Sequence, residues 1–229
     1  MIPLRDNAHS DHFPLITVTI IALNTLLFMY EVSLGEAGMN ELVYIFGLVP
    51  IYYSEYHVSW MGYLPFITST FLHGSWMHLI GNMWVLWLFG DNVEDKMGKL
   101  RFVGFYLLCG LLASATHFLL NIHSEIPVVG ASGAVAGVMG AYFLMFRKAS
   151  VLTFIPPFFL ISVPAWIFLG FWALSQLYGG AAGLLSTGAE QSIAFWAHIG
   201  GFAAGMLLYS FFLRPGHPNY PGQSPRPSV

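Results

Sequence analysis

The chain has 229 residues, of which 8% are charged and 56% hydrophobic, and its mean hydropathy is +0.67. Because a soluble domain usually carries about 25% charged residues, this composition indicates an integral membrane protein and excludes an ordinary soluble domain. The net charge of -3 comes without a basic patch, which argues against nucleic acid as a partner. The single cysteine, Cys109, excludes a disulfide framework and a thiolate metal site.

Six apolar runs approach the ~20 residues that a membrane-spanning helix requires. They cover residues 14–33, 75–93, 101–121, 132–148, 156–178 and 191–213. The sequence therefore predicts an all-α integral membrane protein whose six-helix domain occupies residues 14–213. A short segment, 1–13, precedes this domain, and a Pro-rich tail expected to be disordered, 214–229, follows it. The first run is interpreted as a retained anchor, because no small-residue cleavage site follows it.

The connections between the runs carry their own signals. Residues 34–74 are long, apolar and rich in aromatics, so they either lie in the headgroup zone or fold as a cap over the helix ends. Pro156, Pro157 and Pro164 predict a fifth helix that is loosened or kinked. The glycine-rich stretch 178–188 predicts a mobile flap or a merely loose connection.

The basic residues orient the bundle. With six spans, all of them fall on one side of the membrane: Arg5; Lys96, Lys99 and Arg101; Arg147 and Lys148; Arg214 and Arg226. The positive-inside rule then places both termini in the cytoplasm, and the absence of a targeting extension fits a bacterial plasma membrane. Asp91, Glu94 and Asp95 fall on the same side and are interpreted as solvated turn residues.

Ser132 opens the fourth run and is flanked by Gly130 and Gly133. Glycines permit a sharp turn and the close approach of a substrate carbonyl, and the Ser132 N–H is one of the unpaired donors at a helix start. The position suits a nucleophile. A serine at a helix start is also a common N-cap, so both interpretations stay open.

His198 lies near the start of the sixth run, at a depth similar to that of Ser132. Gly201 and Gly205 share its helix face, and Gly133 begins a comparable small-residue groove on the fourth run, so the two helices can approach closely. An imidazole beside a serine supplies the general base that the hydroxyl needs. The alternative is a buried histidine that binds a backbone carbonyl. The apolar stretches around His198 offer no Asp or Glu at its depth, and Asp91, Glu94 and Asp95 lie at the opposite membrane face, so a catalytic pair would be a Ser–His dyad.

His78 and Asn82 are four residues apart and therefore share one face of the second predicted helix. Both can donate hydrogen bonds to a developing oxyanion, together with the Ser132 N–H. The alternative is interhelical hydrogen bonding that only stabilises the bundle.

The nine histidines raise the question of a metal site. No His-x-x-x-His or His-Glu-x-x-His pattern accompanies them in the apolar runs, so neither a metal nor another cofactor is predicted. His117, Asn121 and His123 are interpreted as interfacial polar packing, and His73 as a structural partner of the first long connection.

Four motifs, taken in order, resemble those of the rhomboid intramembrane serine proteases. They are His73-Gly-Ser-Trp-Met-His78-Leu-Ile-Gly-Asn82, Gly90-Asp-Asn-Val-Glu94-Asp-Lys-Met-Gly98, Gly130-Ala-Ser132-Gly133 and Ala197-His198-Ile-Gly-Gly201. The resemblance extends from about residue 14 to residue 213, and it implies a helical bundle around a water-filled cavity. Many family members carry an aromatic residue four positions after the nucleophile, stacked on the histidine. Here that position is Ala136, so no residue is assigned to support His198.

The resemblance also implies a function. Ser132 would be the nucleophile, His198 the base, and His78, Asn82 and the Ser132 N–H the oxyanion donors. The substrates would be single-span membrane proteins cleaved at or near the external side, with entry controlled by the fifth helix and the loop after it. The alternative is a non-proteolytic member that binds or chaperones membrane proteins through the same groove. A proton-relaying transporter is disfavoured, because the polar residues do not continue to the cytoplasmic side.

Overall fold

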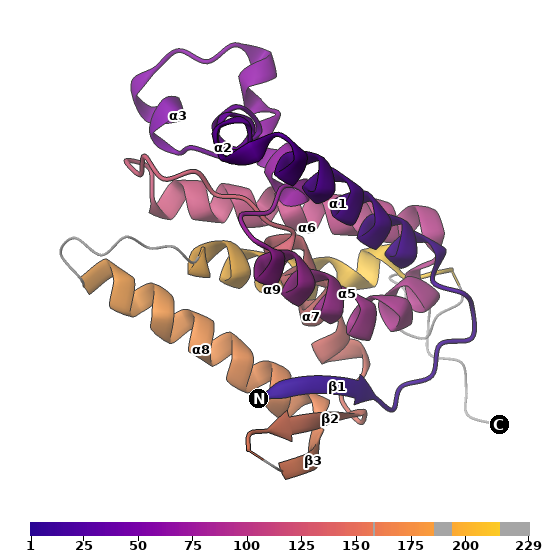
Figure 1. Cartoon of the computed structure of the whole chain (residues 1–229). Coiled ribbons are helices and arrows are strands. Elements are labelled where there is room, and N and C mark those ends of the chain that lie inside the picture. The colour runs from indigo at the N-terminus through magenta and orange to yellow at the C-terminus, as the bar shows by residue number, and fades with distance from the viewer. Residues whose placement is uncertain (158, 186–193, 216–229) are drawn as a thin grey trace.

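The computed structural model of the chain describes residues 1–157, 159–185 and 194–215. Its strands are β1 (Ile2–Asp6), β2 (Ser150–Ile155) and β3 (Phe159–Pro164). Its α-helices are α1 (Leu15–Ser33), α2 (Gly35–Phe46), α3 (Ile51–Glu55), α4 (Pro65–Thr68), α5 (Trp76–Met97), α6 (Lys99–Leu120), α7 (Ser132–Met145), α8 (Ala165–Leu185) and α9 (Phe195–Phe212). Two 3-10 helices, η1 (Trp60–Tyr63) and η2 (Ser69–Phe71), complete the set. Figure 1 shows the long helices packed as a bundle with a small sheet at one end.

The central helix of the bundle is α7, which is buried along nearly its whole length and packs against α5, α6, α8 and α9. Its backbone touches that of α9. A Cβ added to Gly201 would lie 2.0 Å from the Gly133 oxygen, and one added to Gly205 would lie 1.9 Å from the Gly137 oxygen. Only residues without a side chain allow this approach. The equal offset of the two pairs shows that α7 and α9 run in the same direction, so their first turns lie at the same end of the bundle.

The two ends of the bundle differ in charge. At one of them α5 ends, α6 begins and α9 ends. There the Arg214 N–H donates to the Lys96 carbonyl over 3.1 Å, and the Arg101 guanidinium donates to the Leu213 carbonyl. We call this the basic end. The opposite end, where α7 and α9 begin, is the site end.

The sheet corrects the expectation of an all-α protein. It is antiparallel, in the order β1-β2-β3, and lies beside the start of α8 (Figure 1). Val151 and Thr153 of β2 are buried while their neighbours are less so, and β-branched residues at alternating positions favour a strand. Pro156 and Pro157 follow, where a helix could not continue because proline lacks the N–H and restricts the residue before it.

The fifth helix also differs from its prediction. It begins at Ala165 and ends at Leu185, rather than covering residues 156–178. The predicted kink is wrong, because all three prolines precede the helix. The stretch 178–188, predicted as a flap or loose connection, continues α8 as far as Leu185, and the rest of it lies outside the described residues.

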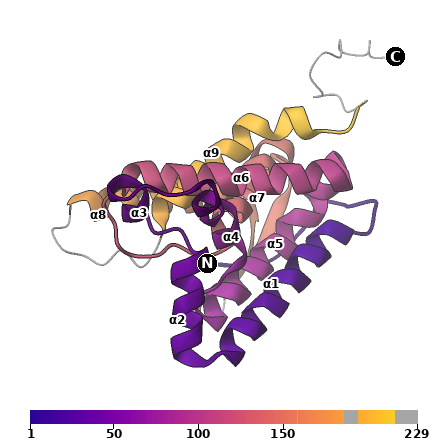
Figure 2. The same cartoon turned by 90° about the horizontal axis from the view of Figure 1, so that it is seen from above.

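The long first connection folds as a cap of short helices from α2 to η2. Gly35 begins it with a φ of 71°, in the left-handed region that favours glycine, and Figure 2 shows α1 and α2 meeting at a sharp angle there. Leu48 and Val128 exchange two backbone hydrogen bonds of 3.0 and 2.8 Å. The cap is thereby fastened to the segment that leads into α7.

Among the described residues, three helices are long and apolar enough to cross a membrane: α1, α6 and α9. α7 is apolar but shorter. The chain is therefore a mostly helical protein with membrane-embedded helices. The tail predicted over 214–229 lies, beyond Pro215, outside the described residues.

Candidate active site

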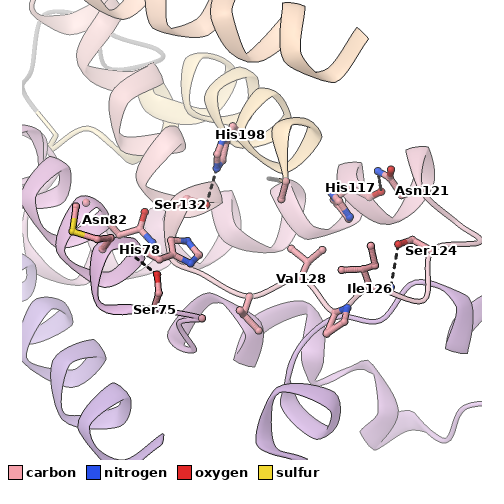
Figure 3. Close-up of a pocket in the computed structure, with 16 residues that line it drawn as sticks. Ser75, His78, Asn82, His117, Asn121, Ser124, Ile126, Val128, Ser132 and His198 are labelled. Atoms are coloured by element: carbon pink, nitrogen blue, oxygen red, sulfur yellow. Dashed lines mark hydrogen bonds between the residues drawn. The ribbon is translucent and has the colours of Figure 1, made fainter. Parts of the chain in front are cut away.

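A cavity of about 670 Å³ opens at the site end of the bundle (Figure 3). Its walls come from α5, α6, α7, α9 and the segment between α6 and α7. The polar side chains that line it are Ser75, His78, Asn82, His117, Asn121, Ser124, Ser132 and His198. The cavity therefore offers hydroxyl, imidazole and amide groups, and none of these described side chains is a carboxylate.

Ser132 and His198 meet in this cavity. The Ser132 Oγ lies 2.8 Å from the His198 Nε2. Ser132 is the first residue of α7 and His198 lies in the first turn of α9, so the parallel, close-packed helices bring the two side chains together. Both are partly buried, with access to the cavity.

The hydroxyl of Ser132 does not cap its own helix. The N-cap position is Ala131, and no side chain makes a capping hydrogen bond there. Gly130 turns the chain with a φ of 127°, and its N–H donates to the Ser69 carbonyl over 2.8 Å. The interpretation of Ser132 as an N-cap is therefore wrong, and its hydroxyl instead bonds the imidazole.

His78 and Asn82 converge on the turn before Ser132 from the same face of α5. A Cβ built on Gly130 would lie 2.5 Å from the His78 Nε2 and 3.6 Å from the Asn82 Nδ2. Figure 3 shows both side chains on the wall of the cavity near Ser132. Two nitrogen groups thus flank the backbone two residues before the hydroxyl, and a side chain at position 130 would displace them.

His73, in the linker before α5, holds Asn82. The Asn82 Nδ2 donates to the His73 Nε2 over 3.1 Å, which engages one of the two amide hydrogens. Burial, together with the neighbouring His78, lowers the pKa of His73 to about 3, so the ring stays neutral and can accept this bond. The backbone N–H of His73 donates to the Glu31 carboxylate of α1 over 3.2 Å.

His117 and Asn121 line the cavity, and only His123 of this group is exposed and outside it. The Asn121 amide donates to the His117 carbonyl over 2.9 Å. Within the described residues no group of three or more His, Cys, Asp or Glu side chains is placed to hold a metal ion.

All of these cavity residues lie in a part of the chain that matches a known domain. The Rhomboid domain matches residues 59–215, which is more than half of the chain. The chain belongs to the rhomboid family. The family predicted from the four motifs is thereby confirmed.

Several curated rhomboid proteins are similar in sequence. Rhomboid protein 1, mitochondrial, of Saccharomyces cerevisiae is 30% identical over 154 residues, which cover 66% of this chain and 42% of that protein. Rhomboid-like protein 11, chloroplastic, of Arabidopsis thaliana is 26% identical over 191 residues, or 81% and 64% of the two chains. Presenilin-associated rhomboid-like protein, mitochondrial, of Mus musculus is 30% identical over 116 residues, or 47% and 31%. This rhomboid chain thus spans less than two thirds of the length of each.

Two residues of the rhomboid site were not found from sequence, and both lie on α8. The Gln176 Oε1 lies 2.7 Å from the His198 Nδ1, and the Trp172 ring centroid lies 5.9 Å from that of His198 at an interplanar angle of 36°. They contact the His198 ring by a hydrogen bond and a ring–ring contact, which the methyl side chain of Ala136 cannot provide. A signal was present, because Gln176 is a polar residue inside an apolar helix and shares its face with Trp172 four residues earlier.

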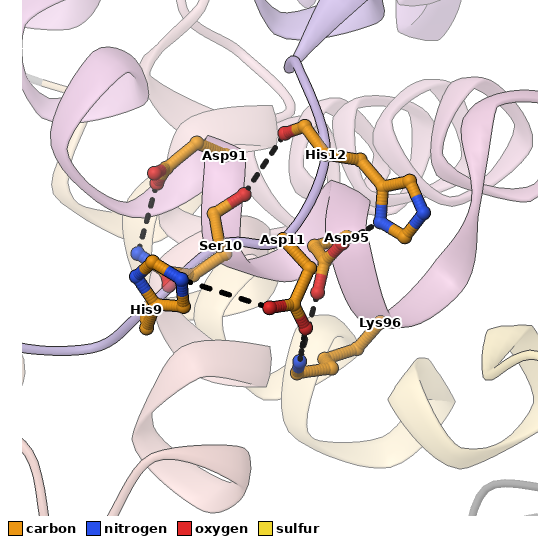
Figure 4. Close-up of polar contacts among 8 residues, drawn as sticks. His9, Ser10, Asp11, His12, Asp91, Asp95 and Lys96 are labelled. Carbon is orange, nitrogen blue, oxygen red and sulfur yellow. Dashed lines mark hydrogen bonds and ion pairs between the residues drawn. The ribbon is translucent and has the colours of Figure 1, made fainter.

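Glu94 and Asp95 of α5 lie at the basic end, where they are buried and paired rather than solvated as predicted. Asp91 is half-buried and accepts from the Asn92 amide over 2.9 Å, and Figure 4 shows Asp91 and Asp95 at this end. Glu94 accepts the N–H groups of Ile16 and Thr17 at 2.9 and 2.8 Å, and the Thr17 hydroxyl at 2.9 Å. Asp95 bonds Lys96 at 2.8 Å and the His12 Nδ1 at 2.6 Å. These groups fasten the start of α1 to the end of α5.

Proposed function

We propose that this rhomboid protein is a serine endopeptidase that hydrolyses peptide bonds of single-span membrane proteins. The observation that supports the proposal is the 2.8 Å contact between the Ser132 Oγ and the His198 Nε2 inside an accessible cavity. A serine hydroxyl becomes a useful nucleophile only when a base can take its proton. The family match makes intramembrane proteolysis the natural use of that pair.

In the first step, the Ser132 Oγ attacks the scissile carbonyl and the His198 Nε2 takes its proton. The carbonyl oxygen becomes an oxyanion, for which the donors are the Ser132 N–H, His78 and Asn82. The convergence of His78 and Asn82 on Gly130 supports these roles, since it puts both nitrogens beside the backbone that leads to Ser132.

In the second step, His198 returns the proton to the leaving amine and an acyl-enzyme remains on Ser132. Water from the cavity then attacks the ester, with His198 again acting as the base. No metal or other cofactor takes part in this scheme.

Reconstituting the full chain in liposomes with a single-span substrate tests the proposal. Ser132→Ala should lower cleavage by about 10⁴-fold or more, because the nucleophile is lost and only binding and the oxyanion donors remain. Ser114→Ala, a serine of α6 outside the cavity lining, is the matched control and should cleave like the wild type. Equal cleavage by Ser132→Ala and the wild type would remove the catalytic claim. Wild type that cleaves nothing and does not react with a fluorophosphonate at Ser132 would favour a non-proteolytic binder.

We also propose six membrane spans: α1, α5, α6, α7, α8 and α9. The gathering of Lys96, Arg101 and Arg214 at the basic end supports this topology, because it puts these charges on one side of the membrane. Both termini would lie on that side and the cavity on the other. Single cysteines can be placed at His9 or at Ser124 in a Cys109→Ala background and labelled with a thiol reagent. A membrane-impermeant blocking reagent should prevent labelling of the two positions only when it is added to opposite faces of the membrane.

The topology does not identify the cellular membrane that holds the protein. The names of the similar rhomboid proteins place those proteins in mitochondria or chloroplasts, which weighs against the expectation of a bacterial plasma membrane. The proposed topology holds for either location, with the basic end facing the cytoplasm, matrix or stroma. Fractionation of source cells, probed with an antibody to this chain, decides between them.

A further inference from the structure

Gln176 holds the side of the His198 ring that faces away from the nucleophile. Both ring nitrogens have a partner: the Nδ1 lies 2.7 Å from the Gln176 Oε1, and the Nε2 lies 2.8 Å from the Ser132 Oγ. An amide oxygen can only accept a hydrogen bond, so the Nδ1 carries the proton. The Nε2 is then the unprotonated nitrogen that accepts the Ser132 hydroxyl, which is the tautomer that a general base requires.

The orientation of the Gln176 amide is fixed within α8. Its Nε2 donates to the Ser175 Oγ over 3.1 Å, and that hydroxyl donates to the Trp172 carbonyl over 2.6 Å. With the amide nitrogen used in this way, the amide oxygen is the atom that faces the imidazole.

The same face of α8 packs on the N-terminal half of α9 above and below this bond. One turn before Gln176, the Trp172 ring lies beside His198 and 5.8 Å from the Phe202 ring. One turn after it, a Cβ added to Gly180 would lie 3.1 Å from the Trp196 ring. The contact to the base is therefore part of the docking of α8 against α9.

The partner of His198 is also neutral. In the described part of the chain, none of the ion pairs involves His198. An amide fixes the tautomer as a carboxylate would, but it does not stabilise the imidazolium that forms when the base takes a proton.

We propose that Gln176 is a positioning residue: by accepting the Nδ1–H of His198, it fixes the base in its productive tautomer, and it does so only while α8 is docked on α9. The inference rests on the proposed protease function. It makes the docking of α8 a condition for activity, in addition to any part that this helix plays in admitting substrate.

Kinetics of the reconstituted full chain test the role. Gln176→Ala should lower kcat about 10–100-fold, as is typical when the partner of a functional histidine is removed, and leave KM within about twofold. Leu174→Ala, an exposed neighbour on α8, is the matched control and should keep wild-type kcat. Wild-type kcat in Gln176→Ala, or an equal loss in Leu174→Ala, would overturn the proposal.

Gln176→Glu separates positioning from packing. A carboxylate at this position accepts the same Nδ1–H and stabilises the imidazolium, so kcat should return to within about tenfold of wild type. The acid limb of the profile of kcat/KM against pH should move upward by about 1 unit or more. His78 and His117, the other titratable groups that act on His198, are unchanged in all variants. A Gln176→Glu enzyme as slow as Gln176→Ala, with an unshifted profile, would count against the proposal.

A measurement without substrate distinguishes failure of this inference from failure of the proposed function. ¹⁵N NMR of histidine-labelled Ser132→Ala protein, assigned by comparison with His198→Gln, should show His198 protonated at Nδ1 and bare at Nε2. The additional change Gln176→Ala should abolish that pattern. If the pattern survives, Gln176 does not set the tautomer, whatever the activity of the wild type.

Discussion

The two ends of the bundle use histidine in opposite ways. At the basic end, the His12 Nδ1 bonds the Asp95 carboxylate at 2.6 Å, and Lys96 bonds the same carboxylate (Figure 4). At the site end, the His198 Nε2 bonds the Ser132 hydroxyl at 2.8 Å (Figure 3), and its Nδ1 bonds the Gln176 amide at 2.7 Å. The basic end is built around ionisable carboxylates and their hydrogen-bond partners. The site end is built from hydroxyl, amide and imidazole groups.

The basic end holds helices together, whereas the site end is arranged for chemistry. At the basic end the carboxylates are already hydrogen-bonded within the protein, so they are not free to bind a substrate. They hold the start of α1 against α5. Neutral groups around a cavity keep a nitrogen lone pair and N–H donors directed at one place, where charge would develop only during a reaction.

The two histidines should differ most in activity. His198→Ala should lower cleavage of a reconstituted substrate by about 10³–10⁴-fold or more, because Ser132 loses its base. His12→Ala should leave kcat within about twofold, since it lies at the other end of the bundle. Comparable losses in both variants would show that the two ends are not functionally separate.

Asn82 should affect rate more than binding. Asn82→Ala removes one proposed oxyanion donor and should lower kcat by about 10²–10³-fold with little change in KM. Ile80→Ala, an exposed position on the same helix, serves as the control. A rise in KM at constant kcat would instead indicate that Asn82 only binds substrate.

Glu94 should matter for stability and not for chemistry. Its removal in Glu94→Ala leaves the N–H groups of Ile16 and Thr17 without their acceptor, which should cost about 1–3 kcal/mol of folding stability. Thermal unfolding in detergent measures this as a lower Tm, while kcat per folded molecule stays unchanged. Glu94→Gln, which keeps one acceptor oxygen, should fall between the variant and the wild type.

His73 gives the site end a dependence on pH. Its folded pKa of about 3 lies below the ordinary value of 6.5, so between these values the unfolded chain binds more protons than the folded one. Stability should therefore be fully present above pH 6.5 and fall as the pH drops below it, by at most about 1.4 kcal/mol per unit from this residue. His73→Gln, which can still accept from Asn82, should flatten the decline of Tm in this range. Identical slopes would show that His73 is not buried as a neutral ring.

The motifs predicted the family, which is confirmed, and the apolar runs predicted helices where α1, α5, α6, α7 and α9 lie. The sheet was missed because the segment 150–164 is both apolar and β-branched, and periodicity alone does not separate a buried strand from a buried helix over so short a run. The burial of Glu94 and Asp95 was missed because their partners, His12 and Thr17, come from a segment that the sequence set apart from α5.

The residues of the candidate site could be predicted where they stand in short sequence motifs, but contacts between distant helices could not. Ser132, His198, His78 and Asn82 stand in recognisable small-residue motifs, but their catalytic roles stay a prediction. The contact of Gln176 with His198 depends on how α8 is rotated and how deeply it packs on α9, and neither follows from the residues of α8 alone. A polar residue in an apolar helix marks the position without naming its partner.

The strand β1 has a consequence for how the protein is made. Ile2 pairs with Phe154, so the first strand leaves the ribosome before all the helices from α1 to α7 and waits for its partner until they have been synthesised. Pairing so distant in sequence is intrinsically slow to form. It can form only if α1 has entered the membrane in the orientation that leaves β1 beside the turn after α7. Pairing of β1 with β2 therefore requires that α1 has the orientation that puts its N-terminal end on the same side as the turn after α7.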